Sequence, residues 1–285
     1  VLRYEDDSDD WEVVVVKGPL NKGVNLRAVS GYLDASAGLS DSKQTKAFAF
    51  GDDGKMLRLE DGNWSDAKAE LEADLRDIWV TDDVAVAVGD GGTIVRRKTA
   101  GWAGENSGTL EDLHGVAGNG EELVAVGTGG TVVQRVNGQW SELLAPTTED
   151  LFGVVSDGED WIVVGGKGTI LRYSDGEWSE EVSGTSAQLK DIWCAEDGSL
   201  YAVGNKGTVV YSPGDGAWGT LPVSSSSDLE SVFGHQGEIW VVGNWVILRG
   251  NLTGLEVAQT LSSDYLYGIW VAGDESVLAV GWAGL

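Results

Sequence analysis

The stretch DLRDIWVTDDVAVAVGDGGTIVRRKTAGW, residues 74–102, is one copy of a unit that recurs along the chain. Its opening leucine has counterparts at regular intervals, and the middle spacings are 38, 38, 38, 40 and 37 residues. Each of the last six of these leucines follows a tryptophan, or in one case a leucine, by 11 residues. The unit leucines are Leu26, Leu75, Leu113, Leu151, Leu189, Leu229 and Leu266. A repeat of this length predicts a solenoid, a propeller or an array.

Each unit contains four segments that are typical of short strands. Leu-x-x-Ile-Trp and Val-Ala-Val-Ala-Val-Gly are rich in β-branched and aromatic residues. The third segment follows a glycine-rich turn, residues 89–93, and the fourth follows Asp-Gly-x-Trp. Both connections read as hairpins, because glycine reaches the positive φ that tight turns need. Four antiparallel strands in each of seven units, without helical periodicity, predict an all-β fold, a seven-bladed β-propeller around a central channel.

The two ends of the chain predict how the ring closes. The last unit stops where its third strand should begin, and residues 1–4, VLRY, resemble that missing strand. We therefore expect N-terminal strands to complete the C-terminal blade, so that the seventh blade is formed by about 264–285 plus 1–14. Such closure would leave no free sheet edge at the seam. Residues 1–285 are expected to form a single propeller domain.

Acidic residues dominate the charge of the chain. It has 46 Asp and Glu against 19 Lys and Arg, which gives a net charge of −27. Duplex DNA would be repelled, so no nucleic-acid partner is expected. A solvated acidic surface that maintains solubility is one explanation. The other is an origin in a halophilic organism, where molar salt screens the repulsion between carboxylates.

The sequence lacks the residues that several kinds of catalytic and binding site require. Two histidines and one cysteine are too few for a three-ligand zinc site built from those residue types. No nucleophile elbow or phosphate-binding loop is present, and no apolar run approaches the ~20 residues of a membrane span. We therefore expect a protein that is not an enzyme, with no catalytic residues, metal, cofactor or membrane span, and a monomer. Its location is left open, with a slight preference for the extracellular space or cell surface.

The residue directly after each unit leucine varies most, and it is expected at the mouth of the channel. These residues are Arg27, Arg76, His114, Phe152, Lys190, Glu230 and Tyr267. Three of the seven are Lys or Arg, in a chain where only 19 of 285 residues are. They could form an anion-accepting patch. Alternatively, they could pair with the aspartates that precede the same leucines, Asp74, Asp112, Asp150 and Asp228.

Aromatic residues gather at the same predicted face in the last two units. Trp245 and Trp282 stand in the turns before the third strand, and Tyr265 and Tyr267 are close to them in the repeat register. Large aromatic residues beside arginines are typical of a binding anchor, although packing between blades would also explain them. The predicted partner-binding residues are Arg27, Arg76, His114, Lys190, Trp245, Tyr267 and Trp282.

The repeat, with its run Ala-Val-Gly-x-x-Gly-Thr-Ile and its shortened Asp-box, Ser174-Asp175-Gly176-Glu177-Trp178, resembles that of the photosystem II stability/assembly factor-like propellers. These belong to the wider Asp-box (BNR) group. The resemblance covers all seven units. It implies a seven-bladed, non-enzymatic assembly scaffold that holds a partner polypeptide with an arginine-rich patch. That role would fall on Arg27, Arg76 and Lys190.

The sequence is compatible with two functions from different classes. The first is a protein-binding scaffold that uses the channel-mouth face. The second is a carbohydrate-binding or glycoside-hydrolysing propeller of the Asp-box type, in which aromatic residues stack on sugar and Asp77, Asp191 or Glu230 act as carboxylates.

Overall fold

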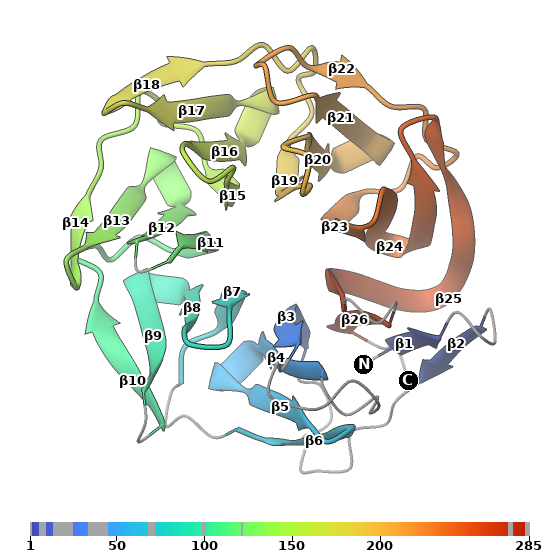
Figure 1. Ribbon diagram of the computed structural model, residues 1–285, viewed down its shortest axis with the longest axis horizontal. Coiled ribbons are helices and arrows are strands. Elements are labelled where there is room, and N and C mark those ends of the chain that lie inside the picture. The colour runs from blue at the N-terminus through green and yellow to red at the C-terminus, as the bar shows by residue number, and fades with distance from the viewer. Residues whose placement is uncertain are drawn as a thin grey trace.

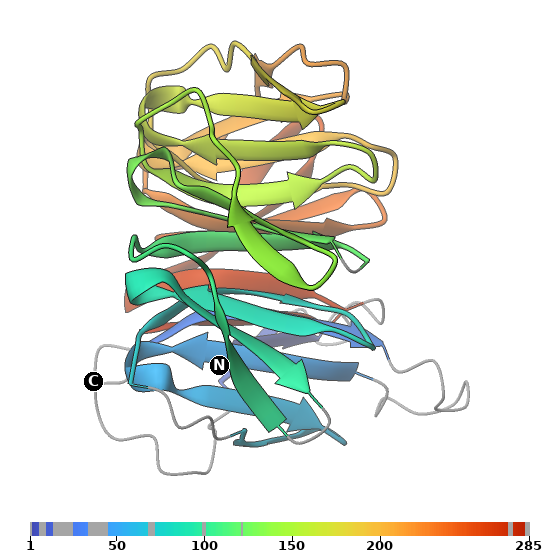
Figure 2. The same cartoon turned by 90° about the vertical axis from the view of Figure 1, so that its left-hand side faces the viewer.

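The fold is a ring of β-sheets around a central opening, as the computed structural model in Figure 1 shows. The structure describes residues 2–5, 10–13, 25–33, 45–67, 72–98, 101–120, 122–272 and 276–282. Figure 2 shows the ring edge-on, with the strands crossing from one face to the other. The predicted all-β propeller of four-stranded antiparallel blades is therefore correct in its main features.

Five of the sheets have four antiparallel strands each, ordered from the channel to the rim (Figure 1). The strands are β3 (Leu26–Leu33), β4 (Thr45–Gly51), β5 (Met56–Glu60) and β6 (Asn63–Asp66); β7 (Leu75–Val80), β8 (Ala85–Gly89), β9 (Thr93–Lys98) and β10 (Gly101–Asn106); β11 (Leu113–Asn119), β12 (Glu122–Gly127), β13 (Val132–Val136) and β14 (Gln139–Glu142); β15 (Leu151–Ser156), β16 (Trp161–Gly165), β17 (Ile170–Ser174) and β18 (Glu177–Glu180); and β19 (Leu189–Cys194), β20 (Leu200–Gly204), β21 (Thr208–Ser212) and β22 (Gly219–Thr220).

The sixth sheet has six strands, and it corrects the predicted blade count. Its strands, in spatial order, are β2 (Asp10–Val13), β1 (Leu2–Glu5), β26 (Val277–Trp282), β25 (Gly254–Val271), β24 (Glu238–Asn251) and β23 (Leu229–His235). The prediction of seven separate blades is wrong, because the described residues form six sheets. The last two repeat units share this one sheet, since β25 contains both the fourth strand of one unit and the first strand of the next.

The connection between these two units differs from the described connections between others. In two of those, the strand has ended and a Ser hydroxyl accepts the backbone N–H two residues on, as Ser107 does for Thr109 and Ser183 for Thr185. Between the last two units, β25 continues unbroken over 18 residues. In the part of β24 that replaces the usual turn, Asn244-Trp245-Val246 is one residue shorter than residues 90–93, and no 3₁₀ turn forms.

The two ends of the chain share the sixth sheet, as the repeat register predicts. Leu2 pairs with Ala279 and Tyr4 with Val277, so β1 lies beside β26. Parts of the predicted closing blade, including residues 6–9, 273–275 and 283–285, lie outside the described residues.

Apolar side chains fill the spaces between neighbouring repeat units. The described residues form seven buried clusters, and each joins strands of two adjacent units. The unit leucines belong to these clusters and are at most 4% exposed. One cluster, which includes Trp240, Leu266 and Val277, lies between the two halves of the six-stranded sheet. The repeat unit is thus the element of packing even where the sheets merge.

Short 3₁₀ turns connect the second and third strands in five units. They are η1 (Asp52–Gly54), η2 (Asp90–Gly92), η3 (Thr128–Gly130), η4 (Gly166–Gly168) and η5 (Asn205–Gly207). The middle residue of each has positive φ, and Gly91, Lys167 and Lys206 all occupy that position. Glycine is therefore not obligatory there, contrary to the simplest interpretation of the sequence.

Candidate partner-binding face

Seven β-bulges place the variable residues at the channel mouth. In every unit, the pairing of the first and second strands shifts between the unit leucine and the residue two positions later. The residue between them is left out of the register, and bulges of this kind redirect a side chain. All seven redirected residues, with Gln188, line one opening of 260 Å³. The predicted ring of mouth residues therefore exists in this structure.

Each basic residue of the ring is neutralised by an acidic neighbour. Arg27 Nε lies 2.6 Å from a carboxylate oxygen of Asp52. Lys190 Nζ lies 2.5 Å from Glu230, which is itself a mouth residue. The remaining one, Arg76, donates to Asp90 and lies 3.4 Å from Asp112. The pairing alternative thus describes this ring better than a free anion-accepting patch.

Most of the acids that pair with the ring are not the ones expected. The aspartates before the unit leucines instead accept backbone N–H groups from the turn of the preceding unit. The bonds are Asp53 N to Asp74 (2.9 Å), Gly91 N to Asp112 (2.8 Å), Gly129 N to Asp150 (2.8 Å) and Lys206 N to Asp228 (2.8 Å). These carboxylates therefore clamp neighbouring units together, and of the four only Asp112 also contacts a basic mouth residue.

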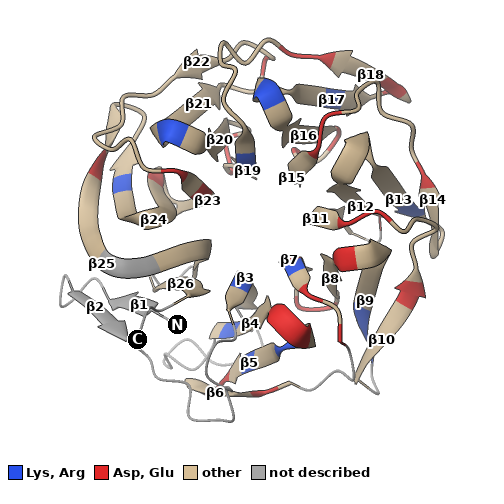
Figure 3. Cartoon of the chain, turned by 180° about the vertical axis from the view of Figure 1, so that it is seen from behind, with Lys and Arg blue, Asp and Glu red and all other residues tan. Residues whose placement is uncertain are grey.

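The face around the opening is acidic. Figure 3 views it and shows basic segments on β3, β7 and β19 among acidic turns and connections. Asp74, Asp150 and Asp228 accept backbone N–H groups, and among the described residues no cationic side chain forms an ion pair with them. A docked segment with positive charge would complement this face.

The histidine of the ring does not act as a cation. Its Nε2 lies 3.2 Å from Thr128 Oγ1, and its ring stacks on Phe152 with 5.2 Å between centroids. Burial and the nearby Arg76 lower the pKa of His114, so it is neutral at pH 7. His114 and Phe152 together form an apolar, aromatic part of the mouth.

Below the mouth, two carboxylates line a channel cavity of 390 Å³. Asp77 accepts the backbone N–H of Val116 at 2.8 Å, and Asp191 accepts that of Val232 at 2.9 Å. Each bond joins the first strands of two neighbouring units. Although the channel leaves part of each side chain accessible, the surrounding protein raises the pKa of Asp77 to about 7 and that of Asp191 to about 6 by desolvation.

These two carboxyls should make the protein less stable as the pH rises. Their folded pKa values, about 7 and about 6, exceed the ordinary value of 3.8, so the folded state holds protons that the unfolded chain has lost. The free energy of unfolding should therefore decrease from about pH 4 to pH 7. Urea unfolding at several pH values would measure this slope. An Asp77→Asn, Asp191→Asn double variant should flatten it, and equal slopes would contradict the assignment.

An aromatic cluster, Trp245, Tyr265 and Trp282, lies on the same face. The Trp245 and Tyr265 ring centroids are 5.4 Å apart, and those of Tyr265 and Trp282 are 5.8 Å apart. Trp245 is 46% exposed and Trp282 39%. Neither tryptophan lines the opening, but Tyr267 does, and Arg27 covers its ring at 5.7 Å. The predicted partner-binding residues thus form two adjoining parts of one face. Tyr265, which is expected at this face but is not among the predicted partner-binding residues, contacts both tryptophans.

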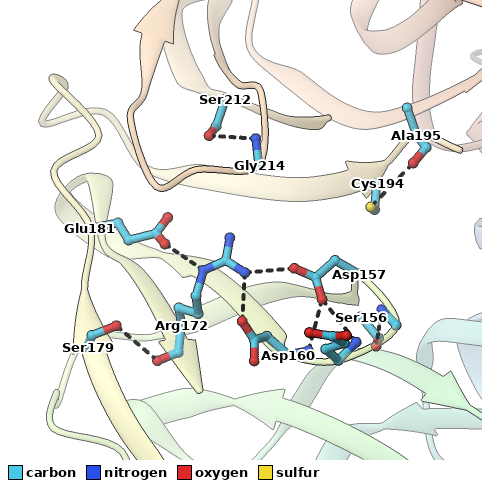
Figure 4. A network of polar contacts seen from close by, with 12 residues as sticks. Ser156, Asp157, Asp160, Arg172, Ser179, Glu181, Cys194, Ala195, Ser212 and Gly214 are labelled. Carbon is cyan, nitrogen blue, oxygen red and sulfur yellow. Dashed lines mark hydrogen bonds and ion pairs between the residues drawn. The ribbon is translucent and has the colours of Figure 1, made fainter. Parts of the chain in front are cut away.

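An ion-pair network of one arginine and three carboxylates lies away from this face. Arg172 on β17 contacts Glu181 and Asp157, each at 2.7 Å, and Asp160 at 3.1 Å (Figure 4). Burial lowers the pKa of Arg172, but the hydrogen bonds to these carboxylates raise it, and the net shift is upward. Arg172 therefore stays charged and ties its strand to the adjoining loop. Among the described residues, no group of three His, Cys, Asp or Glu side chains is arranged to hold a metal ion.

Comparisons with known proteins agree on the fold. No protein-family model matches the chain, and no curated protein matches it in sequence. The solved structure of YCF48 from Cyanidioschyzon merolae is similar, with a TM-score of 0.69, 16% identity, and coverage of 92% of this chain and 94% of that one. A structure of YCF48 bound to D1 peptide has a TM-score of 0.69, 15% identity, and coverage of 90% and 89%.

Propellers of another kind are equally similar. The WD40 repeats of RRP9 give a TM-score of 0.73 with 10% identity, and cover 94% of this chain and 90% of that one. Within the residues described here, no helix has the length and apolar character needed to cross a membrane. At identities this low, the comparisons show that the chain has the β-propeller fold.

Proposed function

We propose that this protein is a non-enzymatic scaffold that holds a polypeptide segment on its channel-mouth face. The observation that carries the proposal is the set of seven bulged residues around one opening. Every unit has the bulge, but the side chain at the bulged position differs from unit to unit, as expected of a surface that recognises a partner. The structure of YCF48 bound to D1 peptide is a structural neighbour that supports this class of function.

The proposal can be tested with a displayed library of random peptides. Peptides selected on the intact protein should bind a His114→Ala, Phe152→Ala double variant at least about tenfold more weakly, because the two stacked rings offer the apolar part of the mouth. These substitutions leave the ion pairs of the ring in place. Asp82→Asn, Asp83→Asn serves as the control, because both exposed residues lie in the turn between β7 and β8, on the opposite face.

Two outcomes would count against the scaffold. Peptides that bind equally well to the mouth variant would show that this face is not the site. Binding or turnover of oligosaccharides, sensitive to the same variant and found without any peptide binding, would favour the carbohydrate-active alternative.

We also propose that the acidic surface is adapted to high salt. The chain has 46 acidic residues against 19 basic ones, so its carboxylates repel one another, and salt at molar concentration reduces the Debye length to about 3 Å. The melting temperature should therefore rise between dilute buffer and molar potassium chloride. Scanning calorimetry would measure it, and an unchanged melting temperature would rule out this adaptation.

A further inference from the structure

Aromatic residues replace small or polar residues of the repeat at one place in the ring. Trp245 occupies the turn position that Gly91 holds in the second unit, and it keeps the positive φ, 63° against 60°. A bulky residue rarely adopts this conformation, and strain retained at a surface position points to a function. Trp245 is not held there by burial, since 46% of it is exposed.

The other two members of the aromatic cluster replace charged residues. Tyr265 stands where Asp74 stands in the second unit, directly before the unit leucine, and Trp282 stands where Asp90 stands. The clamp that the aspartate provides elsewhere is replaced here by backbone pairing of Tyr265 with Asn244 and with Trp282. The Tyr265 side chain is thereby available to stack between the two tryptophans.

The protein covers other aromatic rings with its own arginines. Arg249 lies 4.8 Å from the ring centroid of Trp240, and Arg27 lies 5.7 Å from that of Tyr267. Within the part of the chain that the structure describes, no cationic group is recorded over Trp245 or Trp282. Both rings are exposed on a face whose carboxylates are in excess. A cation from outside would find there a π-face together with a negative potential.

We infer that the aromatic cluster binds arginine or lysine side chains of a basic polypeptide segment. The inference rests on the proposed function and names the chemistry of its partner. Charge complementarity selects this occupant, because a chain of net charge −27 attracts a basic segment and repels an acidic one. Trp is the best ring for a cation–π contact, and desolvation against the ring strengthens it. Tyr267 adjoins the cluster, so the segment could continue from the aromatic cluster into the mouth.

A titration with two synthetic peptides tests the inference. The first alternates arginine and glycine, and the second has neutral citrulline in place of each arginine. Trp245→Gly and Trp282→Asn are suitable variants, because other units carry Gly91 and Asn205 at these positions. Each variant should weaken binding of the arginine peptide by about fivefold or more. Leu252→Asn is the control, since Leu252 is 50% exposed in the hairpin between β24 and β25 on the opposite face.

The possible results separate the inference from the proposed function. Equal affinity of both tryptophan variants and the intact protein for the arginine peptide would overturn the inference, as would equal affinity for the arginine and citrulline peptides. Library peptides that still depend on His114 and Phe152 would leave the scaffold proposal standing in that case. Conversely, tryptophan-dependent arginine binding without any mouth-dependent peptide would support the cationic site and contradict the proposed role of the mouth.

Discussion

The Gly127→Ala substitution is expected to lower the free energy of unfolding by about 3 kcal/mol. A Cβ atom on Gly127 would lie 2.0 Å from the backbone oxygen of Asp112, which opens the same unit. That oxygen also accepts the N–H of Thr128 at 3.0 Å, so it cannot move away without breaking the turn. The φ of Gly127 is −165°, which any residue can adopt. The cost therefore comes from the contact and not from backbone strain.

Urea unfolding followed by tryptophan fluorescence would measure this change. Gly104→Ala in β10 is the matched control, because a Cβ there would meet no atom within 4 Å and its φ is not positive. Removing this glycine should be neutral or slightly stabilising, since alanine reduces the entropy of the unfolded chain. Similar losses in both variants would show that glycine matters at Gly127 through flexibility rather than through close approach.

The strand pattern could be predicted because each repeat unit contains residues that favour strands and turns locally. Glycine-rich turns and alternation of β-branched residues specify four strands per unit, and a constant spacing between unit leucines specifies a ring. The predicted number of blades was wrong because the sequence between the last two units does not show that the strand continues. Ser262, Ser263 and Asp264 look like the polar connections of other units, yet the backbone of β25 runs through them as a strand. On either side of this stretch Thr260 pairs with Val246 and Tyr265 with Asn244, and composition does not reveal such pairing.

In the candidate site, the positions of the residues could be predicted from the sequence, but their contacts could not. The repeat register predicts that the residues after the unit leucines surround the mouth, and the structure places all seven there. The register does not predict which acidic residues pair with the basic ones. Asp52 and Asp90 lie in turns 25 and 14 residues away from Arg27 and Arg76, and the pairing of Leu26 with Gly51 and of Leu75 with Gly89 brings them together. The bulges that aim the side chains leave no mark in composition at all.

The Glu105→Ala substitution should also destabilise the fold strongly, by about 3 kcal/mol. Glu105 on β10 accepts a hydrogen bond from Arg135 Nε at 3.0 Å and one from Trp140 Nε1 at 2.9 Å, both in the next unit. Its side chain is 12% exposed and that of Arg135 is 7%. The substitution removes a buried ionic partner of Arg135 and the acceptor of the Trp140 indole N–H, and the loss of such a partner costs more than the intact pair contributes.

A double-mutant cycle with Trp140→Phe would isolate the part carried by the indole. Trp178 is a natural comparison for Trp140. In the third unit Leu143 occupies the position that Glu105 holds in the second, and the buried Trp178 Nε1 has no hydrogen-bond partner among the described residues. Trp178→Phe should therefore cost only packing, whereas Trp140→Phe should also remove one of the two hydrogen bonds that Glu105 Oε2 accepts. Equal costs for the two tryptophans, together with no coupling between Glu105 and Trp140, would mean that adjacent units are held together by apolar contacts alone. Coupling of about 1 kcal/mol or more would show that polar bonds across the outer strands help to keep the ring closed.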